Sequence, residues 1–165
     1  MIDAVKKVSP SVVSITITKD VQDFFGQVLT QKGGGTGFII SSDGLIATNK
    51  HVVADAEATY SVFTSTGKEY SARVIAQDPF NDLAVIKIEA SGLPVVEFGD
   101  SDKLQIGQYV VAIGNALGEF SNTVTLGVLS ARNRRLHVSD AQQGTTESLT
   151  GLLQTDAAIN TGNSG

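Results

Sequence analysis

The chain has 165 residues, of which 41% are hydrophobic and 18% charged, and its 17 Asp and Glu against 12 Lys and Arg give a net charge of −5. This composition is typical of a globular chain rather than a disordered one, and the acidic balance argues against nucleic acid or an anionic membrane as the main partner. The sequence contains no cysteine, which excludes disulfides, zinc–thiolate sites and a cysteine nucleophile.

In chain order, the predicted elements begin with a helix at residues 2–8, which ends before Pro10. The turn at residues 41–44 is expected to join two strands as a hairpin. Residues 19–35, with Phe24 and Phe25 exposed, and residues 132–151, with a solvated basic run at 132–135, are expected to be long loops. Short β-branched runs predict strands at residues 12–18, 36–40, 45–48, 60–64, 70–77, 83–88, 109–113, 123–130 and 152–155.

Many short strands with little helical periodicity indicate an all-β fold of the barrel or sandwich type. Turn residues gather at 91–94 and 100–107, which makes this stretch the best candidate for a boundary. We therefore expect an N-terminal region with a first β-barrel at residues 1–98, and a partial second β-barrel at residues 99–165. No apolar run reaches the roughly 18 residues that would cross a bilayer, and the first ten residues do not resemble a secretory signal.

Three local signals point to catalysis. His51 stands just after a predicted strand, Asp82 stands just before another, and Ser164 lies in a glycine-rich string near the end of the sequence. Their order of His, Asp, Ser is the order found in chymotrypsin-type serine proteases and differs from the subtilisin and α/β-hydrolase orders. Because the three residues are far apart in the sequence, only tertiary folding can bring them together.

The chemistry explains these residue types. A serine hydroxyl is a poor nucleophile, so a neutral imidazole must take its proton while it attacks a carbonyl. A carboxylate then fixes the imidazole tautomer and stabilises the imidazolium that forms. The glycines around Ser164 allow the backbone amides of Gly162 and Ser164 to point at the developing oxyanion. We predict a triad of His51, Asp82 and Ser164 with this oxyanion hole.

Each signal alone has a simpler interpretation. A histidine after a strand is usually structural or solvated, an Asn-Asp pair before a strand is ordinary turn chemistry, and a Gly-Asn-Ser-Gly string is a flexible turn. The conjunction of the three on an all-β background is far more specific. His137 is interpreted as an exposed loop residue, and Asp78 and Asp156 as turn or structural carboxylates.

The sequence closely resembles the HtrA family of bacterial trypsin-like serine proteases. The resemblance covers essentially the whole chain and is most specific around His51 and Ser164. By this match, His51 is the general base, Asp82 its orienting carboxylate and Ser164 the nucleophile. The matching segments are residues 35–40, 48–53, 82–88, 111–115, 123–131 and 154–160.

The resemblance implies a chymotrypsin-like or trypsin-like double β-barrel whose second barrel is incomplete, with no metal ion or other cofactor. In such folds the residue six positions before the serine forms the base of the S1 pocket, which here is Ala158, and Ile159 adds apolar surface. With no carboxylate in that pocket, cleavage after small or medium aliphatic residues is expected. Two family prolines are replaced, by Ala116 and by Thr161, and neither change removes a catalytic group.

The implied activity is ATP-independent endoproteolysis of unfolded or exposed polypeptides in protein quality control, outside the cytoplasm. Homotrimers built around the N-terminal region and a C-terminal segment with a PDZ domain are also implied. Family members continue into further strands after the serine. We therefore expect this chain alone to have little peptidase activity, and residues 9–98 to be better ordered than residues 132–165. The alternatives are a catalytically incompetent fragment that acts as a binding or structural module, and a carrier or adhesion barrel.

Overall fold

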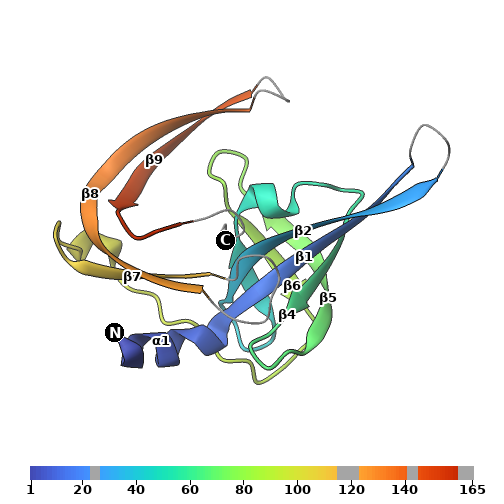
Figure 1. Ribbon diagram of the computed structural model, residues 1–165, viewed down its shortest axis with the longest axis horizontal. Coiled ribbons are helices and arrows are strands. Elements are labelled where there is room, and N and C mark those ends of the chain that lie inside the picture. Colours follow the sequence, from blue (N-terminus) through green and yellow to red (C-terminus); the bar gives the residue numbers. More distant parts are fainter. Residues whose placement is uncertain (23–26, 115–122, 141–144, 160–165) are drawn as a thin grey trace.

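The computed structural model describes residues 1–22, 27–114, 123–140 and 145–159 of the chain. These residues form a closed β-barrel and a separate open sheet, preceded by a short helix (Figure 1). The elements are α1 (Ile2–Val8), η1 (Ser9–Ser11), β1 (Val12–Gln22), β2 (Val28–Ile39), β3 (Leu45–Thr48), η2 (Lys50–Val53), β4 (Thr59–Phe63), β5 (Glu69–Gln77), β6 (Ala84–Ile88), η3 (Ser101–Lys103), β7 (Tyr109–Gly114), β8 (Thr123–Asp140) and β9 (Thr145–Thr155).

The barrel closes in the strand order β1-β2-β3-β6-β5-β4, and every neighbouring pair is antiparallel. Along its strands, every second side chain points into the barrel, and many of these are β-branched. Full burial of each such side chain stabilises the fold by about 1.5–3 kcal/mol. The expected all-β fold is confirmed. The barrel core consists of Val13, Ile15, Ile39, Ile46, Val52, Val53, Tyr60, Val62, Ala84, Ile86 and Ile88.

The hairpin between β2 and β3 forms as predicted, with Phe38 opposite Ala47 and Ile39 opposite Ile46. Its turn depends on Gly44, whose φ of +103° is in the region that favours glycine. A Cβ at this position would also lie 2.3 Å from the backbone oxygen of Ile88. The turn therefore packs against the end of β6, which fixes the register between β3 and β6.

The second unit is a three-stranded antiparallel sheet in the order β7-β8-β9. In Figure 1 the β8–β9 hairpin forms an arch to the left of the barrel, and β7 lies nearer to α1. The strands of the closed barrel all lie between residues 12 and 88, and those of the second sheet between residues 109 and 155. The division into domains at residues 98 and 99 stays a prediction.

Two predicted loops are wrong. Residues 19–22 and 28–35 belong to β1 and β2, which pair from Val12–Phe38 out to Gln22–Val28 and project from the barrel as an arm (Figure 1). Most of residues 132–151 likewise belongs to β8 and β9. Neither segment alternates apolar and polar residues over its full length, because both faces of these hairpins are largely exposed where they are described. Phe24 and Phe25 lie outside the described residues.

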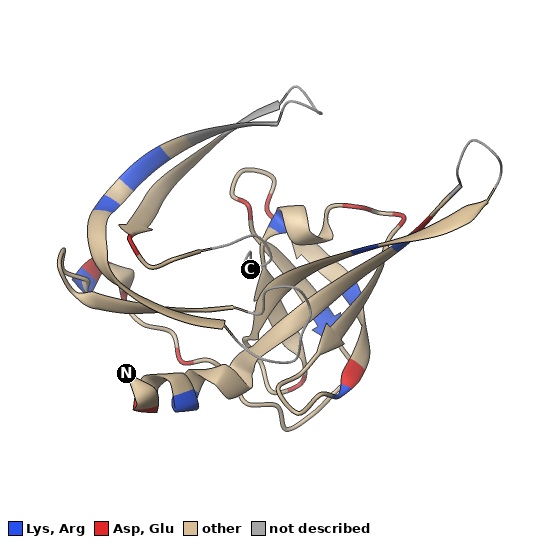
Figure 2. Cartoon of the chain, viewed as in Figure 1, with Lys and Arg blue, Asp and Glu red and all other residues tan. Residues whose placement is uncertain are grey.

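The basic run at 132–135 is also part of β8 rather than a solvated loop. Arg132 donates hydrogen bonds to the backbone oxygens of Leu104 (2.8 Å) and Asp102 (2.9 Å). Its side chain is only 28% exposed. The arginine thus ties β8 to the segment that precedes β7. Figure 2 shows the other basic residues of β8 along the outer part of the arch.

Candidate active site

His51 is placed by η2, the single turn that follows β3. The next two residues, Val52 and Val53, are buried in the barrel core and hold the turn against it. The imidazole of His51 points outward, and its side chain is 56% exposed. The sequence therefore combines an anchored backbone with an accessible side chain, which is what a proton-transferring residue requires.

Asp82 is placed by a tight loop at residues 78–83 that leads into β6. The carboxylate of Asp78 closes this loop by accepting hydrogen bonds from the backbone amides of Phe80 (2.8 Å) and Asn81 (2.9 Å). It also accepts one from the Asn81 side chain (3.1 Å). These bonds, led by the Asn81 amide, lower the pKa of Asp78. Asp78 is thus a turn carboxylate, as its sequence context indicated.

The structure brings His51 and Asp82 together through two contacts. The Oδ2 atom of Asp82 lies 2.6 Å from Nδ1 of His51, and its Oδ1 atom accepts a hydrogen bond of 2.9 Å from the His51 backbone amide. The Asp82 side chain is 18% exposed and that of His51 56%, so the carboxylate is largely covered while the imidazole stays open to solvent. With Nδ1–H donated to the carboxylate, Nε2 of the imidazole is left to accept a proton.

Asn49 is a residue of this site that the sequence reasoning missed. Its side-chain Nδ2 donates a hydrogen bond of 2.8 Å to the backbone oxygen of Asp82. The signal in the sequence was an amide side chain two positions before His51, at the end of a strand. Only the pairing of β3 with β6, in which Thr48 lies opposite Ala84, makes this contact possible.

The segment that the sequence analysis assigns to the S1 pocket, within residues 156–159, follows β9 and lies against β8. The Oδ1 atom of Asp156 accepts a hydrogen bond of 2.7 Å from the Val128 backbone amide. Thr125 Oγ1 donates one of 2.8 Å to the Ala158 backbone oxygen. Gly127 permits this approach, since a Cβ there would lie 2.3 Å from the amide nitrogen of Ala157. The sequence interpretation of Asp156 as structural agrees with this geometry.

The structure describes only two of the remaining predicted site residues. Ala158 and Ile159 are exposed at the end of this described stretch, and Ile159 is 63% exposed. Ser164 and Gly162 lie outside the described residues, so the nucleophile and the oxyanion hole stay predictions. The structure thus joins His51 to Asp82.

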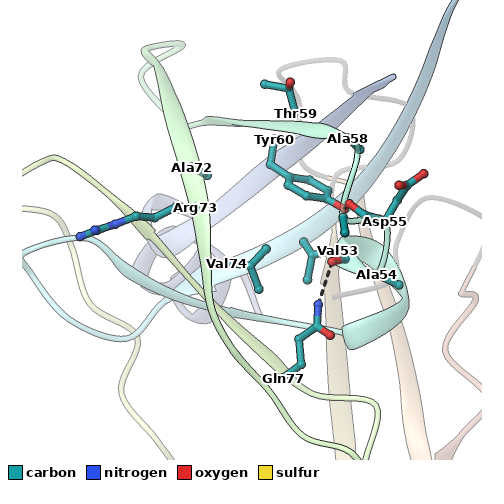
Figure 3. Close-up of a pocket in the computed structure, with 11 residues that line it drawn as sticks. Val53, Ala54, Asp55, Ala58, Thr59, Tyr60, Ala72, Arg73, Val74 and Gln77 are labelled. Carbon is teal, nitrogen blue, oxygen red and sulfur yellow. Dashed lines mark hydrogen bonds between the residues drawn. The ribbon is translucent and has the colours of Figure 1, made fainter. Parts of the chain in front are cut away.

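A pocket of about 490 Å³ lies beside η2, lined by residues that follow η2 and by residues of β4 and β5 (Figure 3). Along one side, Gln77 Nε2 donates a hydrogen bond of 2.9 Å to the backbone oxygen of Val53, drawn as a dashed line in Figure 3. Neither His51 nor Asp82 lines this pocket. The pocket therefore does not belong to the site, and the Gln77 bond at its side holds the end of the turn that carries His51.

Charged groups near the same turn form a small ion-pair network. Lys19 of β1 lies 2.8 Å from a carboxylate oxygen of Asp55 and 3.0 Å from one of Glu57. Its hydrogen bond to Asp55 is the main cause that raises the pKa of Lys19, and the same bond lowers the pKa of Asp55. These groups are partly or fully exposed, so the network contributes little to stability.

No three His, Asp or Glu side chains cluster as a metal site would require in the part of the chain that the structure describes. None of the helices within that part has both the length and the apolar character needed to cross a lipid bilayer.

An accessible imidazole held by a carboxylate on a six-stranded antiparallel barrel defines a class of protein, the trypsin-like peptidases. Residues 35–165 match the family described as the trypsin-like peptidase domain, and the chain belongs to this family. Within it, the chain is similar to the HtrA-type serine proteases. The solved structure of the HtrA-type protease AlgW with a decapeptide superimposes with a TM-score of 0.81 at 33% identity, covering 99% of this chain and 53% of that one.

Two curated relatives agree with this placement. A probable periplasmic serine endoprotease, DegP-like, of Chlamydia muridarum is 51% identical over 132 residues, which cover 79% of this chain and 24% of the relative. The putative serine protease HhoB of Synechocystis sp. is 41% identical over 181 residues, which cover 98% of this chain and 42% of the relative. The chain therefore spans less than half the length of these relatives. The resemblance to the HtrA family and to its double-barrel fold is confirmed.

Proposed function

We propose that the chain carries the catalytic centre of an HtrA-type serine endopeptidase, with His51, Asp82 and Ser164 as its triad. The observation that carries this proposal is the double contact between Asp82 and His51, which leaves Nε2 of an exposed imidazole as a proton acceptor. Membership of the trypsin-like peptidase family supports it.

In the proposed reaction, Nε2 of His51 takes the proton from Ser164 Oγ while that oxygen bonds to the carbonyl carbon of the scissile peptide. The carbonyl oxygen becomes an oxyanion, which the amides of Gly162 and Ser164 stabilise. The imidazolium then gives its proton to the leaving amine, and the C–N bond breaks to leave an acyl-enzyme. Water, deprotonated by His51, hydrolyses the ester and restores Ser164.

The substrates we propose are unfolded or exposed polypeptides, cleaved after small or medium aliphatic residues that enter a pocket based on Ala158 and Ile159. The role in protein quality control, an extracytoplasmic location, assembly as a homotrimer and a partner segment with a PDZ domain are proposals of the same kind. The extracytoplasmic location is supported by relatives whose names describe periplasmic serine endoproteases, and a polypeptide substrate by a neighbour solved with a decapeptide; the quality-control role, the trimer and the PDZ segment rest on the family resemblance alone.

The test is turnover of casein by a longer form of the chain that includes the strands expected after Ser164, which is the parent in the experiments below, compared with its Ser164→Ala and His51→Ala variants. Both variants should lose nearly all activity, Ser164→Ala by a factor of about 10⁶ on precedent for triad serines. Asp43→Asn, which changes an exposed carboxylate in the β2–β3 turn, serves as a control and should leave turnover unchanged. Activity that survives Ser164→Ala would contradict the proposal.

A further inference from the structure

We infer that Asn49 is a positioning residue of the catalytic centre, one that keeps the Asp82 carboxylate on His51 by holding the Asp82 backbone. This inference rests on the proposed function. It assigns the side chain a role that acts through Asp82 and not on the substrate. The contact that carries it is the hydrogen bond from Nδ2 to the backbone oxygen of Asp82, at 2.8 Å.

The position of Asn49 makes this contact unexpected. Asn49 is the N-cap residue of η2, and an asparagine at an N-cap ordinarily accepts a hydrogen bond from the amide two or three residues further on. Here its side chain makes no such cap. The amide two residues on is that of His51, and it donates to Oδ1 of Asp82 instead. The carboxylate thus takes the place of the local cap.

The two bonds form a reciprocal pair between the segments. Asn49 donates to the Asp82 backbone, and the Asp82 side chain accepts from the His51 backbone. A side-chain oxygen turned back on η2 would compete with Asp82 for the His51 amide. By donating outward, Asn49 both removes this competitor and fixes the distance between the loop of Asp82 and η2. The second carboxylate oxygen then lies 2.6 Å from Nδ1 of the ring.

A second hydrogen bond makes it possible to distinguish positioning of Asp82 from simple support of η2. Gln77 makes a bond of the same kind to the other end of η2, from a side-chain amide to the backbone oxygen of Val53, and both bonds are partly buried. The Gln77 bond does not involve Asp82. If rigidity of η2 alone mattered, loss of either bond would have a similar effect. If the placement of Asp82 matters, only the loss of the Asn49 bond will change catalysis.

The experiment compares Asn49→Ala and Asn49→Ser with Gln77→Ala as the matched control. Serine caps helices about as well as asparagine but is too short to keep the bond to Asp82. Turnover should fall about ten- to a hundredfold in both Asn49 variants, because a misplacement of about 1 Å can cost about 10² in rate. KM should stay within about twofold of the parent. In Gln77→Ala, turnover and KM should both stay within about twofold of the parent values.

A second readout does not depend on turnover. In ¹H NMR spectra of the protein, the hydrogen-bonded Nδ1 proton of His51 should be visible in the parent and in Gln77→Ala. It should be broadened by exchange with water in both Asn49 variants. Full turnover in Asn49→Ser, equal losses in the Asn49 and Gln77 variants, or an unchanged Nδ1 proton would overturn the inference. A parent without Ser164-dependent activity would instead overturn the proposed function, and the NMR comparison would still decide the role of Asn49.

Discussion

The carboxylate of Asp82 holds His51 at two points, its backbone amide and its ring nitrogen Nδ1, at 2.9 and 2.6 Å. A carboxylate bound at the ring alone could swing with the imidazole. Binding at both points ties the ring to its own backbone through a single partner, so the direction of Nε2 is set by the positions of the two loops that carry these residues.

Replacement of Asp82 by asparagine tests the ring contact. The side-chain amide of the introduced asparagine can donate to Nδ1, which places the ring proton on Nε2 and removes the proton acceptor. For Asp82→Asn we expect turnover to fall by about 10⁴, with little change in fold, as for a wrong tautomer in other triads. The measurement is kcat on a peptide substrate together with far-ultraviolet circular dichroism. A folded Asp82→Asn variant with parental kcat would refute the role of Asp82.

The stability of the loop that carries Asp82 should depend on pH, because the carboxylate of Asp78 closes this loop. Its folded-state pKa is lowered by hydrogen bonds from Asn81 and Phe80. A lowered pKa means that the stabilisation is present above the ordinary aspartate value of about 3.9 and is lost as the pH falls through the folded value. The free energy of unfolding should therefore differ between parent and Asp78→Asn at about pH 6–7. The difference should shrink below about pH 4, and a constant difference down to about pH 2 would contradict this account.

Much of the fold could be predicted because burial of one face of a strand places apolar side chains at every second residue. The run at residues 12–18 contains Val13 and Ile15, both buried in the barrel, and the alternation of such residues is visible in the sequence. The two long hairpins could not be found in this way. Glycine and polar residues such as those at 30–34 have no buried face, and only pairing with the opposite strand makes them extended.

The pairing of His51 with Asp82 was predictable from the sequence, but the contacts that support it were not. The order of His51 and Asp82 indicated which side chains to join, and the expected contact between them is present. The contact of Ser164 with His51 stays a prediction. Asn49 escaped notice because its partner is a backbone oxygen in the loop that leads into β6, and no spacing rule predicts a contact between a side chain and a distant carbonyl.

Gly127 should be intolerant of a side chain. A Cβ at this position would lie 2.5 Å from Oδ1 of Asp156 and closer still to the Ala157 amide. We expect Gly127→Ala to destabilise the protein by about 1–3 kcal/mol through overpacking and to lower activity by displacing residues 156–158. Gly99→Ala is the matched control, since no atom lies within 4 Å of its Cβ position. Denaturant unfolding of both variants checks this, and equal stabilities would count against it.

Cleavage specificity should follow the side chain at position 158. In the proposed S1 pocket, Ala158 and Ile159 offer apolar surface and no carboxylate, so a peptide library should show cleavage after Val, Ala or Leu. Ala158→Asp should shift the preference towards Lys or Arg, because a carboxylate at the base of the pocket can pair with a basic side chain. A parental preference for Arg or Lys would show that another residue forms the base of the pocket.

The central claim, that His51 and Asp82 activate Ser164, is tested most directly by covalent labelling with a fluorophosphonate. This reagent reacts with an activated serine Oγ, which displaces fluoride and forms a stable phosphonate ester. Mass spectrometry of the intact and digested protein locates the label without any need for a known substrate. We predict one label per chain, on Ser164, and labelling slower by about a thousandfold or more in His51→Ala and in Asp82→Asn. Labelling of another serine, or labelling of Ser164 at the same rate in the His51→Ala variant, would contradict the account.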